Sequence, residues 1–406
     1  MPCMKKSERK KQGVYEDNPA ASSCIVPPDA FIGLPPSDPR LLVPLASSRI
    51  QCLSFRLYSP GSPLGKLFKW CGWLAARTGL LNFAGRLRFA PIDSFQTTNN
   101  IQPILDNALF GELKCKWVRM LGKGPVAVAL SLGTPDNCRK IAALVFDREA
   151  TPLAFAKVGC TPQARSLIAH ERKTLDVVRT LPLQHATIPM LLGQGTTGPA
   201  TWLLQSALLT GRPSPVVLQK VHIDFLADFA QATTRVVSFH TNGIWKQLQR
   251  ILKKPVLPIK SGFEVEKPFI SELVRRFQAS GTEETTKSWP VSAAHGDFAP
   301  WNMRLAEGKI ALFDWEYFLP EAPVGWDLLY FLFRVDNLIK RKALEQIWSE
   351  FHSGAYRNML DKWEKATGFQ VPDRQFLATF VLLSFALDLV PRWVCGQRID
   401  EDSTGT

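Results

Sequence analysis

The densest group of residues that could do chemistry lies between His295 and Glu316 in a chain of 406 residues. The segment reads His-Gly-Asp-Phe-Ala-Pro-Trp-Asn up to Asn302, and Phe-Asp-Trp-Glu follows with its aspartate at Asp314. An amide oxygen and a carboxylate are hard oxygen ligands of the kind that Mg²⁺ prefers. The pattern therefore indicates a reaction that uses a metal ion held by Asn302 and Asp314.

The spacing of these residues predicts a β-hairpin, with strands at 303–305 and 309–313 and a turn at 307–308. Cross-strand neighbours in such a hairpin come within about 5 Å of each other. Asn302 and Asp314 are therefore expected to lie nearly opposite one another.

Asp297, five positions before Asn302, lies on the loop that leads into the predicted hairpin. A carboxylate at this edge could accept the proton of an attacking hydroxyl, so Asp297 is the expected catalytic base.

Taken together, His-Gly-Asp, a following Asn and a later Asp-x-Glu resemble the signature of the aminoglycoside phosphotransferase family and its choline kinase relatives, over the chain from about residue 106 to its end. The resemblance implies a protein kinase-like fold and transfer of the γ-phosphoryl group of ATP or GTP, with Mg²⁺, to a hydroxyl of a small acceptor. Aminoglycosides, amino sugars and amino alcohols are acceptors of this kind. The roles it implies are the catalytic aspartate for Asp297, magnesium ligands for Asn302 and Asp314, a structural brace for His295, the helix aspartate that hydrogen-bonds the catalytic loop for Asp327, and an additional acid for Glu316.

A lysine and a glutamate in the first half of the chain are expected to form an ion pair. Lys157 follows an alternating strand pattern that starts at Leu153, and Glu171 shares the apolar face of the next helix with Leu167 and Leu175. A charged group on an inward face needs a partner. A Lys157–Glu171 pair would hold the nucleotide phosphates; the alternative is a lysine that reaches out to solvent and a partly exposed glutamate.

Two further segments are candidates for nucleotide contact. Gly133 and Thr134 lie in the turn between the first two predicted strands, where backbone N–H groups could cover the phosphates, although a plain hairpin turn explains them equally well. Gln205 and Ala207 lie where a hinge to the second half of the chain is expected, and would offer backbone groups to the base of the nucleotide.

The order of elements predicts an α+β, two-lobed fold: an extension at 1–105, a small sheet-bearing N-lobe at 106–207 and a mainly helical C-lobe at 208–406. A polar loop is expected near 280–288 in the C-lobe. The expected N-lobe elements are strands at 126–132, 140–146 and 153–158, a helix at 162–179, and strands at 188–192 and 202–205.

The extension is predicted to be irregular to about residue 60, because prolines and serines dominate it. Residues 63–89 are basic and repeat Leu67, Trp70, Leu74 and Leu81 near helical spacing. This segment either packs on the catalytic domain or contacts a membrane surface.

The composition limits the cellular location and the kinds of partner that are expected. The eight scattered cysteines fit a reducing compartment, so a cytoplasmic location is expected. The net charge of +13 suits acidic partners such as nucleotides, but no motif for specific nucleic-acid recognition accompanies it. The expected partners are a nucleotide and a small hydroxylated acceptor, the alternative function is a catalytically silent kinase-like scaffold, and the sequence does not indicate an oligomeric state.

Overall fold

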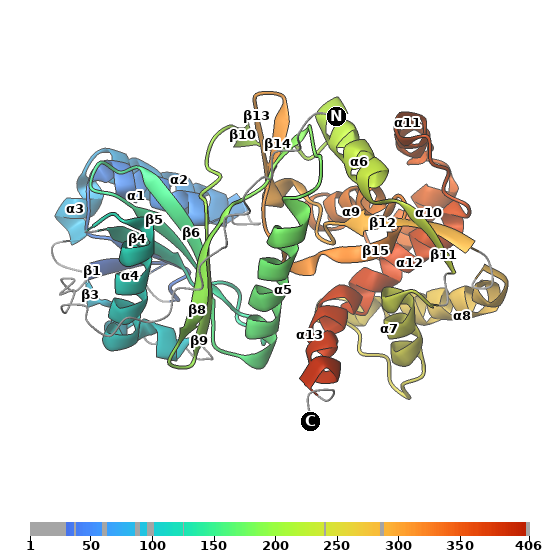
Figure 1. Cartoon of the computed structure of the whole chain (residues 1–406), viewed down its shortest axis with the longest axis horizontal. Coiled ribbons are helices and arrows are strands. Elements are labelled where there is room, and N and C mark those ends of the chain that lie inside the picture. The colour runs from blue at the N-terminus through green and yellow to red at the C-terminus, as the bar shows by residue number, and fades with distance from the viewer. Residues whose placement is uncertain are drawn as a thin grey trace, which may run out of the picture.

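The chain forms two lobes with helix α5 between the sheet of one lobe and the helices of the other (Figure 1). The computed structural model describes residues 30–35, 38–58, 63–85, 90–95, 101–124, 126–238, 241–284 and 288–402. The predicted two-lobed α+β class is confirmed.

The N-lobe is built on an antiparallel eight-stranded sheet in the order β3-β1-β2-β4-β5-β6-β9-β8. Its last five strands, with α5 (Pro162–Val178) inserted between β6 and β8, have the strand and helix order of the kinase-like small lobe. The predicted elements agree closely, except that the strand expected at 188–192 lies at Leu191–Thr197. The bounds are β1 Ala30–Leu34, β2 Leu41–Pro44, β3 Ala90–Pro91, β4 Ala127–Ser131, β5 Ile141–Phe146, β6 Pro152–Gly159, β8 Leu191–Thr197 and β9 Ala200–Gln205.

The prediction of an irregular arm is wrong for residues 30–57. Strands β1 and β2 extend the N-lobe sheet beyond β4, and their side chains Phe31 and Leu42 are buried. The prolines on either side of these short apolar runs suggested loops. Proline is, however, tolerated at strand ends and sheet edges. The boundary drawn at residue 105 therefore cuts through one continuous sheet, whereas residues 1–29 lie outside the described part of the chain.

Three helices of the extension lie on this lobe: α1 (Ser48–Ser54), α2 (Pro63–Arg77) and α3 (Leu80–Gly85). Helix α4 (Asn107–Leu121), which follows the extension, also packs on it. In Figure 1, α1, α2 and α3 lie along the upper edge of the sheet. Helix α2 packs inward through Ala76, and Gly72 touches the Phe55 ring so closely that an added Cβ would lie 2.7 Å from it. Of the predicted apolar row, Leu67, Trp70 and Leu74 are exposed, whereas Leu81 is buried.

The C-lobe is mainly helical, as predicted, and it also holds two small sheets in the orders β10-β13-β14-β7 and β11-β12-β15, of which the sequence predicted only the hairpin β13–β14. The polar loop expected from residue 280 starts later, because α8 continues to Glu284; residues 285–287 lie outside the described part. The strands are β7 Ala186–Thr187, β10 Arg212–Pro213, β11 Arg235–Ser238, β12 Ser288–Ala294, β13 Met303–Ala306, β14 Lys309–Leu312 and β15 Leu319–Pro323. The helices are α6 Lys220–Thr233, α7 Gly243–Leu252, α8 Lys267–Glu284, α9 Trp326–Arg334, α10 Leu344–His352, α11 Arg357–Thr367, α12 Arg374–Ala386 and α13 Leu389–Asp402.

Among the described helices, none is on its own long and apolar enough to cross a membrane. One bent pair, Arg374–Ala386 with Leu389–Gly396, has the length and composition only when its two helices are taken together.

Candidate active site

A cavity of about 770 Å³ opens between the two lobes. Lys157 lines it from β6, Gln205 lines it from the end of β9, and Asn302 and Asp314 line it from the hairpin β13–β14. The cavity therefore brings residues from both halves of the chain to one place.

The predicted hairpin exists, and its turn is formed by Glu307 and Gly308, which both adopt positive φ. Its register differs from the prediction by one residue. Met303 pairs with Leu312, and the Phe313 N–H donates to the Asn302 carbonyl at 3.1 Å. Asn302 thus lies opposite Phe313 rather than Asp314, because the two-residue turn fixes the pairing of the whole hairpin.

The predicted base, Asp297, is held on both of its carboxylate oxygens. Tyr330 on α9 donates its hydroxyl to Oδ1 at 2.8 Å, and Asn302 donates its Nδ2 to Oδ2 at 2.7 Å and to the Asp297 carbonyl at 3.0 Å. Asn302 and Asp297 are therefore in direct contact. Because both hydrogens of the amide face Asp297, the Oδ1 of Asn302 is the atom left for a cation.

Helix α9 fixes the loop that carries Asp297. The buried carboxylate of Asp327 accepts the N–H groups of His295 at 2.6 Å and Gly296 at 3.1 Å, and burial raises its pKa to about 7. Gly296 has a φ of +80°, and a Cβ there would lie 1.9 Å from the Tyr317 carbonyl oxygen. The close passage of two backbones thus requires glycine at this position.

His295 is fully buried and bridges the loop to the hairpin. Its Nδ1 accepts the Asp297 N–H at 3.3 Å and its Nε2 donates to the Phe313 carbonyl at 3.1 Å. Burial lowers the pKa of the ring, which keeps the neutral tautomer that these partners need. These contacts of His295 are those expected of a structural brace.

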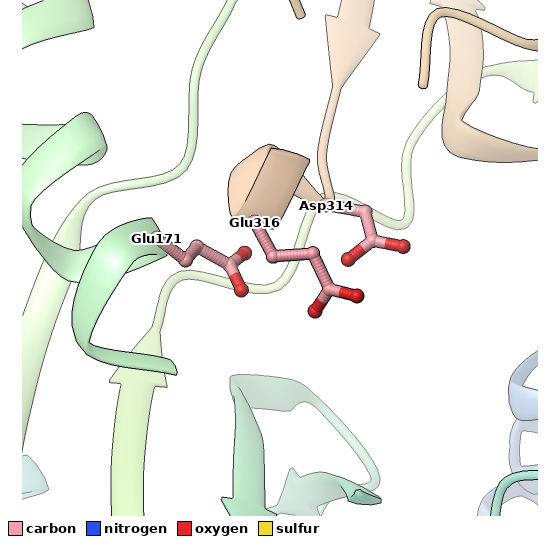
Figure 2. A group of neighbouring side chains, drawn as sticks. All are labelled: Glu171, Asp314 and Glu316. Atoms are coloured by element: carbon pink, nitrogen blue, oxygen red, sulfur yellow. The ribbon is translucent and has the colours of Figure 1, made fainter. Parts of the chain in front are cut away.

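Three carboxylates gather beside the loop: Glu171 from α5, and Asp314 and Glu316 from the turn after β14 (Figure 2). Their oxygens lie within 4.8 Å of one another. Asp314 adopts a left-handed backbone with a φ of 72°, an uncommon conformation for a residue other than glycine that is found preferentially at functional sites.

Lys157 binds all three carboxylates. Its ammonium donates to Glu171 at 2.5 Å, to Glu316 at 3.3 Å and to Asp314. Burial alone would lower the pKa of Lys157, but the three acids raise it well above its usual value, so the lysine is charged. Glu171 is fully buried, which raises its pKa against the effect of Lys157. The alternative of a solvated lysine and a partly exposed glutamate does not describe these side chains.

The two predicted nucleotide segments also line the cavity. Gly133 has a φ of +65° and its Cβ would lie 2.6 Å from the Lys140 carbonyl, so this turn needs glycine. Thr134 and Ala207 line the same space. Gln205 is buried and its Oε1 has no hydrogen-bond partner.

The sequence reasoning missed four polar residues around the site. Tyr330 follows Asp327 by three residues and so shares its helix face, a spacing that could have revealed it. Lys140 pairs with Glu316 at 3.0 Å. Arg56 and Lys69 come from the extension and line the cavity, a long-range contact that no local pattern signals.

No model of a known protein family matches the sequence, and no curated protein is similar to it. Solved structures with a similar overall arrangement are small-molecule phosphotransferases. An aminoglycoside phosphotransferase from Streptomyces rimosus is 13% identical, and the match covers 70% of this chain and 98% of that chain at a TM-score of 0.43. The GDP complex of an aminoglycoside 2′-phosphotransferase is 11% identical, with 71% and 94% covered at a TM-score of 0.42. A spectinomycin phosphotransferase with ADP and spectinomycin is 13% identical, with 72% and 93% covered at 0.41.

At this level of identity, the residues of the cleft itself decide the chemistry.

Proposed function

We propose that the chain is a small-molecule kinase of the aminoglycoside phosphotransferase type, which transfers the γ-phosphoryl group of ATP or GTP to a hydroxyl of a small acceptor. The observation that carries this proposal is the meeting of Asn302 and Asp314 from the C-lobe with Lys157 from the N-lobe in one cleft. Directly behind them, Asp297 contacts Asn302 and Glu171 contacts Lys157. A cation that neutralises phosphates, oxygen ligands for a metal and a positioned carboxylate are the parts that phosphoryl transfer needs.

Each residue then has a role that its contacts support. Asp297, oriented by Tyr330 and Asn302, accepts the proton of the acceptor hydroxyl. Lys157, kept charged and in place by Glu171, neutralises the nucleotide phosphates. The backbone around Gln205 and Ala207, which line the cavity, receives the base of the nucleotide.

The donor set also fits magnesium. The Oδ1 of Asn302 and the carboxylate of Asp314 are hard oxygen ligands from residues that line the cleft, and Glu316 adds a second carboxylate beside them. Magnesium bound by Asn302 and Asp314 would supply positive charge to the phosphate oxygens. Six described cysteines are free thiols, which supports a reducing, cytoplasmic setting for the reaction.

The test is phosphoryl transfer from ATP and from GTP across a panel of hydroxylated metabolites, with an Asp314→Asn variant as control. The proposal expects transfer to at least one acceptor and a loss of about a hundredfold or more in the variant, because the variant lacks a metal-binding carboxylate. Nucleotide binding without transfer to any acceptor would favour the catalytically silent scaffold instead.

A further inference from the structure

Three cations from separate elements meet at the mouth of the cleft. Arg56 belongs to the turn after α1, Lys69 to α2, and Arg304 to β13, and all three line the cavity that holds Lys157 and Asp314. Two of the three thus come from the extension rather than from the kinase-like lobes.

Backbone carbonyls hold these cations in position. Arg56 donates to the Leu209 carbonyl at 2.6 Å, and Arg304 donates to the carbonyls of Thr210 at 3.1 Å and Gly211 at 2.5 Å. The same stretch, directly after the hinge, therefore fixes both guanidinium groups.

No carboxylate balances the three charges. Among the described residues, neither Lys69 nor Arg56 nor Arg304 is in a salt bridge; Lys69 donates to the Tyr58 carbonyl. Burial lowers the pKa of Lys69, and the neighbouring Arg304 and Arg56 lower it further, which shows that the like charges act on one another. Like charges fixed this close together cost free energy that a bound anion would relieve.

We infer that Arg56, Lys69 and Arg304 form a subsite for a phosphate or carboxylate group carried by the acceptor, an inference that rests on the proposed kinase function. Guanidinium groups that are already oriented match the planar geometry of such oxyanions. Polycationic acceptors such as aminoglycosides would instead be repelled at this mouth.

Calorimetric titration of the full chain with inorganic phosphate, in saturating ADP and magnesium, tests the subsite directly. Phosphate is expected to bind the wild type, and to bind at least about fivefold more weakly to Arg56→Gln and Arg304→Gln. A Lys309→Gln variant, which removes an exposed cation at the tip of the same hairpin, should bind phosphate as the wild type does. Equal binding by the wild type and both cleft variants would overturn the subsite.

The source of the anion is decided by two further results. The same titration is repeated without ADP. If phosphate binds without ADP but not in saturating ADP, the anion belongs to the nucleotide and the assignment to the acceptor is overturned. Turnover of polycationic acceptors in preference to phosphorylated or carboxylated hydroxy compounds would also overturn it. The phosphate titration involves no turnover. The subsite can therefore be refuted while the kinase activity is confirmed, and the kinase activity can be refuted while the subsite is confirmed.

A second surface carries an independent inference. Of the sixteen exposed large apolar side chains among the described residues, six lie on α2 and α3. Leu64, Trp70 and Phe83 are 77%, 58% and 78% exposed. The other three are Leu67, Leu74 and Leu80.

In the sequence around α2 and α3, the charge has one sign. Between Asp38 and Asp93 the sequence contains no acidic residue and eight basic ones. An apolar helix face with aromatic residues, set among cations, is the combination that binds the surface of an anionic bilayer. The basic residues are Arg40, Arg49, Arg56, Lys66, Lys69, Arg77, Arg86 and Arg88.

We propose that the exposed apolar face of α2 and α3 docks onto an anionic lipid surface. Lys69 lies on α2 and also lines the cleft, so docking through α2 would bring the cleft mouth near the bilayer.

Cosedimentation with lipid vesicles tests this docking. The full chain is expected to bind vesicles that contain phosphatidylglycerol, to bind pure phosphatidylcholine weakly, and to lose binding in high salt. A Trp70→Ser/Phe83→Ser variant should bind about tenfold more weakly, whereas Val236→Ser/Val265→Ser, which alters two equally exposed apolar side chains elsewhere, should bind normally. Absence of binding by the wild type, or equal losses in both variants, would overturn the docking surface. The docking surface is also overturned if the wild type is a dimer and the Trp70→Ser/Phe83→Ser variant is a monomer. A second copy of the chain would then cover the face.

Discussion

The buried ion pair between Lys157 and Glu171 allows a quantitative test of the N-lobe half of the site. Glu171 is fully buried and its carboxylate lies 2.5 Å from the Lys157 ammonium. Removing one partner of such a pair costs about 3–5 kcal/mol of unfolding free energy, because the other charge remains buried without compensation. Replacing both partners by apolar side chains of similar volume is often nearly neutral.

Lys157→Met and Glu171→Met, singly and together, form a double-mutant cycle for this pair. We expect a coupling energy of about 2–4 kcal/mol, at the lower end if Asp314 and Glu316 keep repelling each other in the double variant. Urea unfolding at pH 7 without nucleotide measures the change in unfolding free energy for the two single variants and the double variant. The matched control is the exposed pair Lys220 and Asp224, 2.8 Å apart, for which alanine variants should couple by less than about 0.5 kcal/mol.

A coupling energy for Lys157 and Glu171 no larger than that of the exposed control would refute the buried pair. A large coupling energy with unchanged nucleotide affinity in Lys157→Met would keep the pair but remove its role in holding phosphates.

Three further variants test the loop, its support and the pH response. Gly296→Ala should abolish turnover and destabilise the fold because its Cβ would lie 1.9 Å from a carbonyl oxygen; Gly368→Ala, with a similar φ and open space around it, should cost only about 1–2 kcal/mol in urea unfolding. Tyr330→Phe should lower kcat about tenfold and leave nucleotide affinity unchanged, since it removes only the hydroxyl that orients Asp297; an unchanged kcat would show that this contact is not needed. Burial lowers the pKa of His222 to about 4, so the unfolded state binds more protons between about pH 6.5 and pH 4 and unfolding free energy should fall by about 3 kcal/mol as pH drops through that window. A His222→Gln variant should lack this part of the pH dependence, and an identical pH profile would contradict the assignment.

Much of the site could be predicted because local sequence patterns indicate its residues. The strand before Lys157 alternates and the helix row of Glu171 is apolar, so two short-range periodicities placed both ends of the ion pair. The hairpin was predicted because Glu307 and Gly308 form a turn between two apolar runs.

The sequence could not predict where the backbone departs from regular strand geometry, or which residues far apart in the chain make contact. Asp314 adopts a left-handed conformation just after the strand, which no local pattern signals. The register, in contrast, follows from the two-residue turn at 307–308, which pairs Asn302 with Phe313. Strands β1 and β2 gain their stability from pairing in a sheet whose neighbouring strand, β4, lies more than eighty residues away in the sequence, and their proline-rich surroundings hid them. Arg56 and Lys69 reach the cleft only through that pairing.

Turnover by Asp297→Ala, measured beside nucleotide binding, tests most directly whether this cleft transfers phosphoryl groups with Asp297 as the base. Loss of a general base lowers rates by about a hundredfold to ten-thousandfold, so transfer to the acceptor found in the panel should fall by that factor. ADP affinity should stay within about twofold of the wild type, because Asp297 contacts Tyr330 and Asn302 rather than the N-lobe. Transfer at a rate close to that of the wild type would contradict the role of Asp297 and, with it, the proposed chemistry of the cleft.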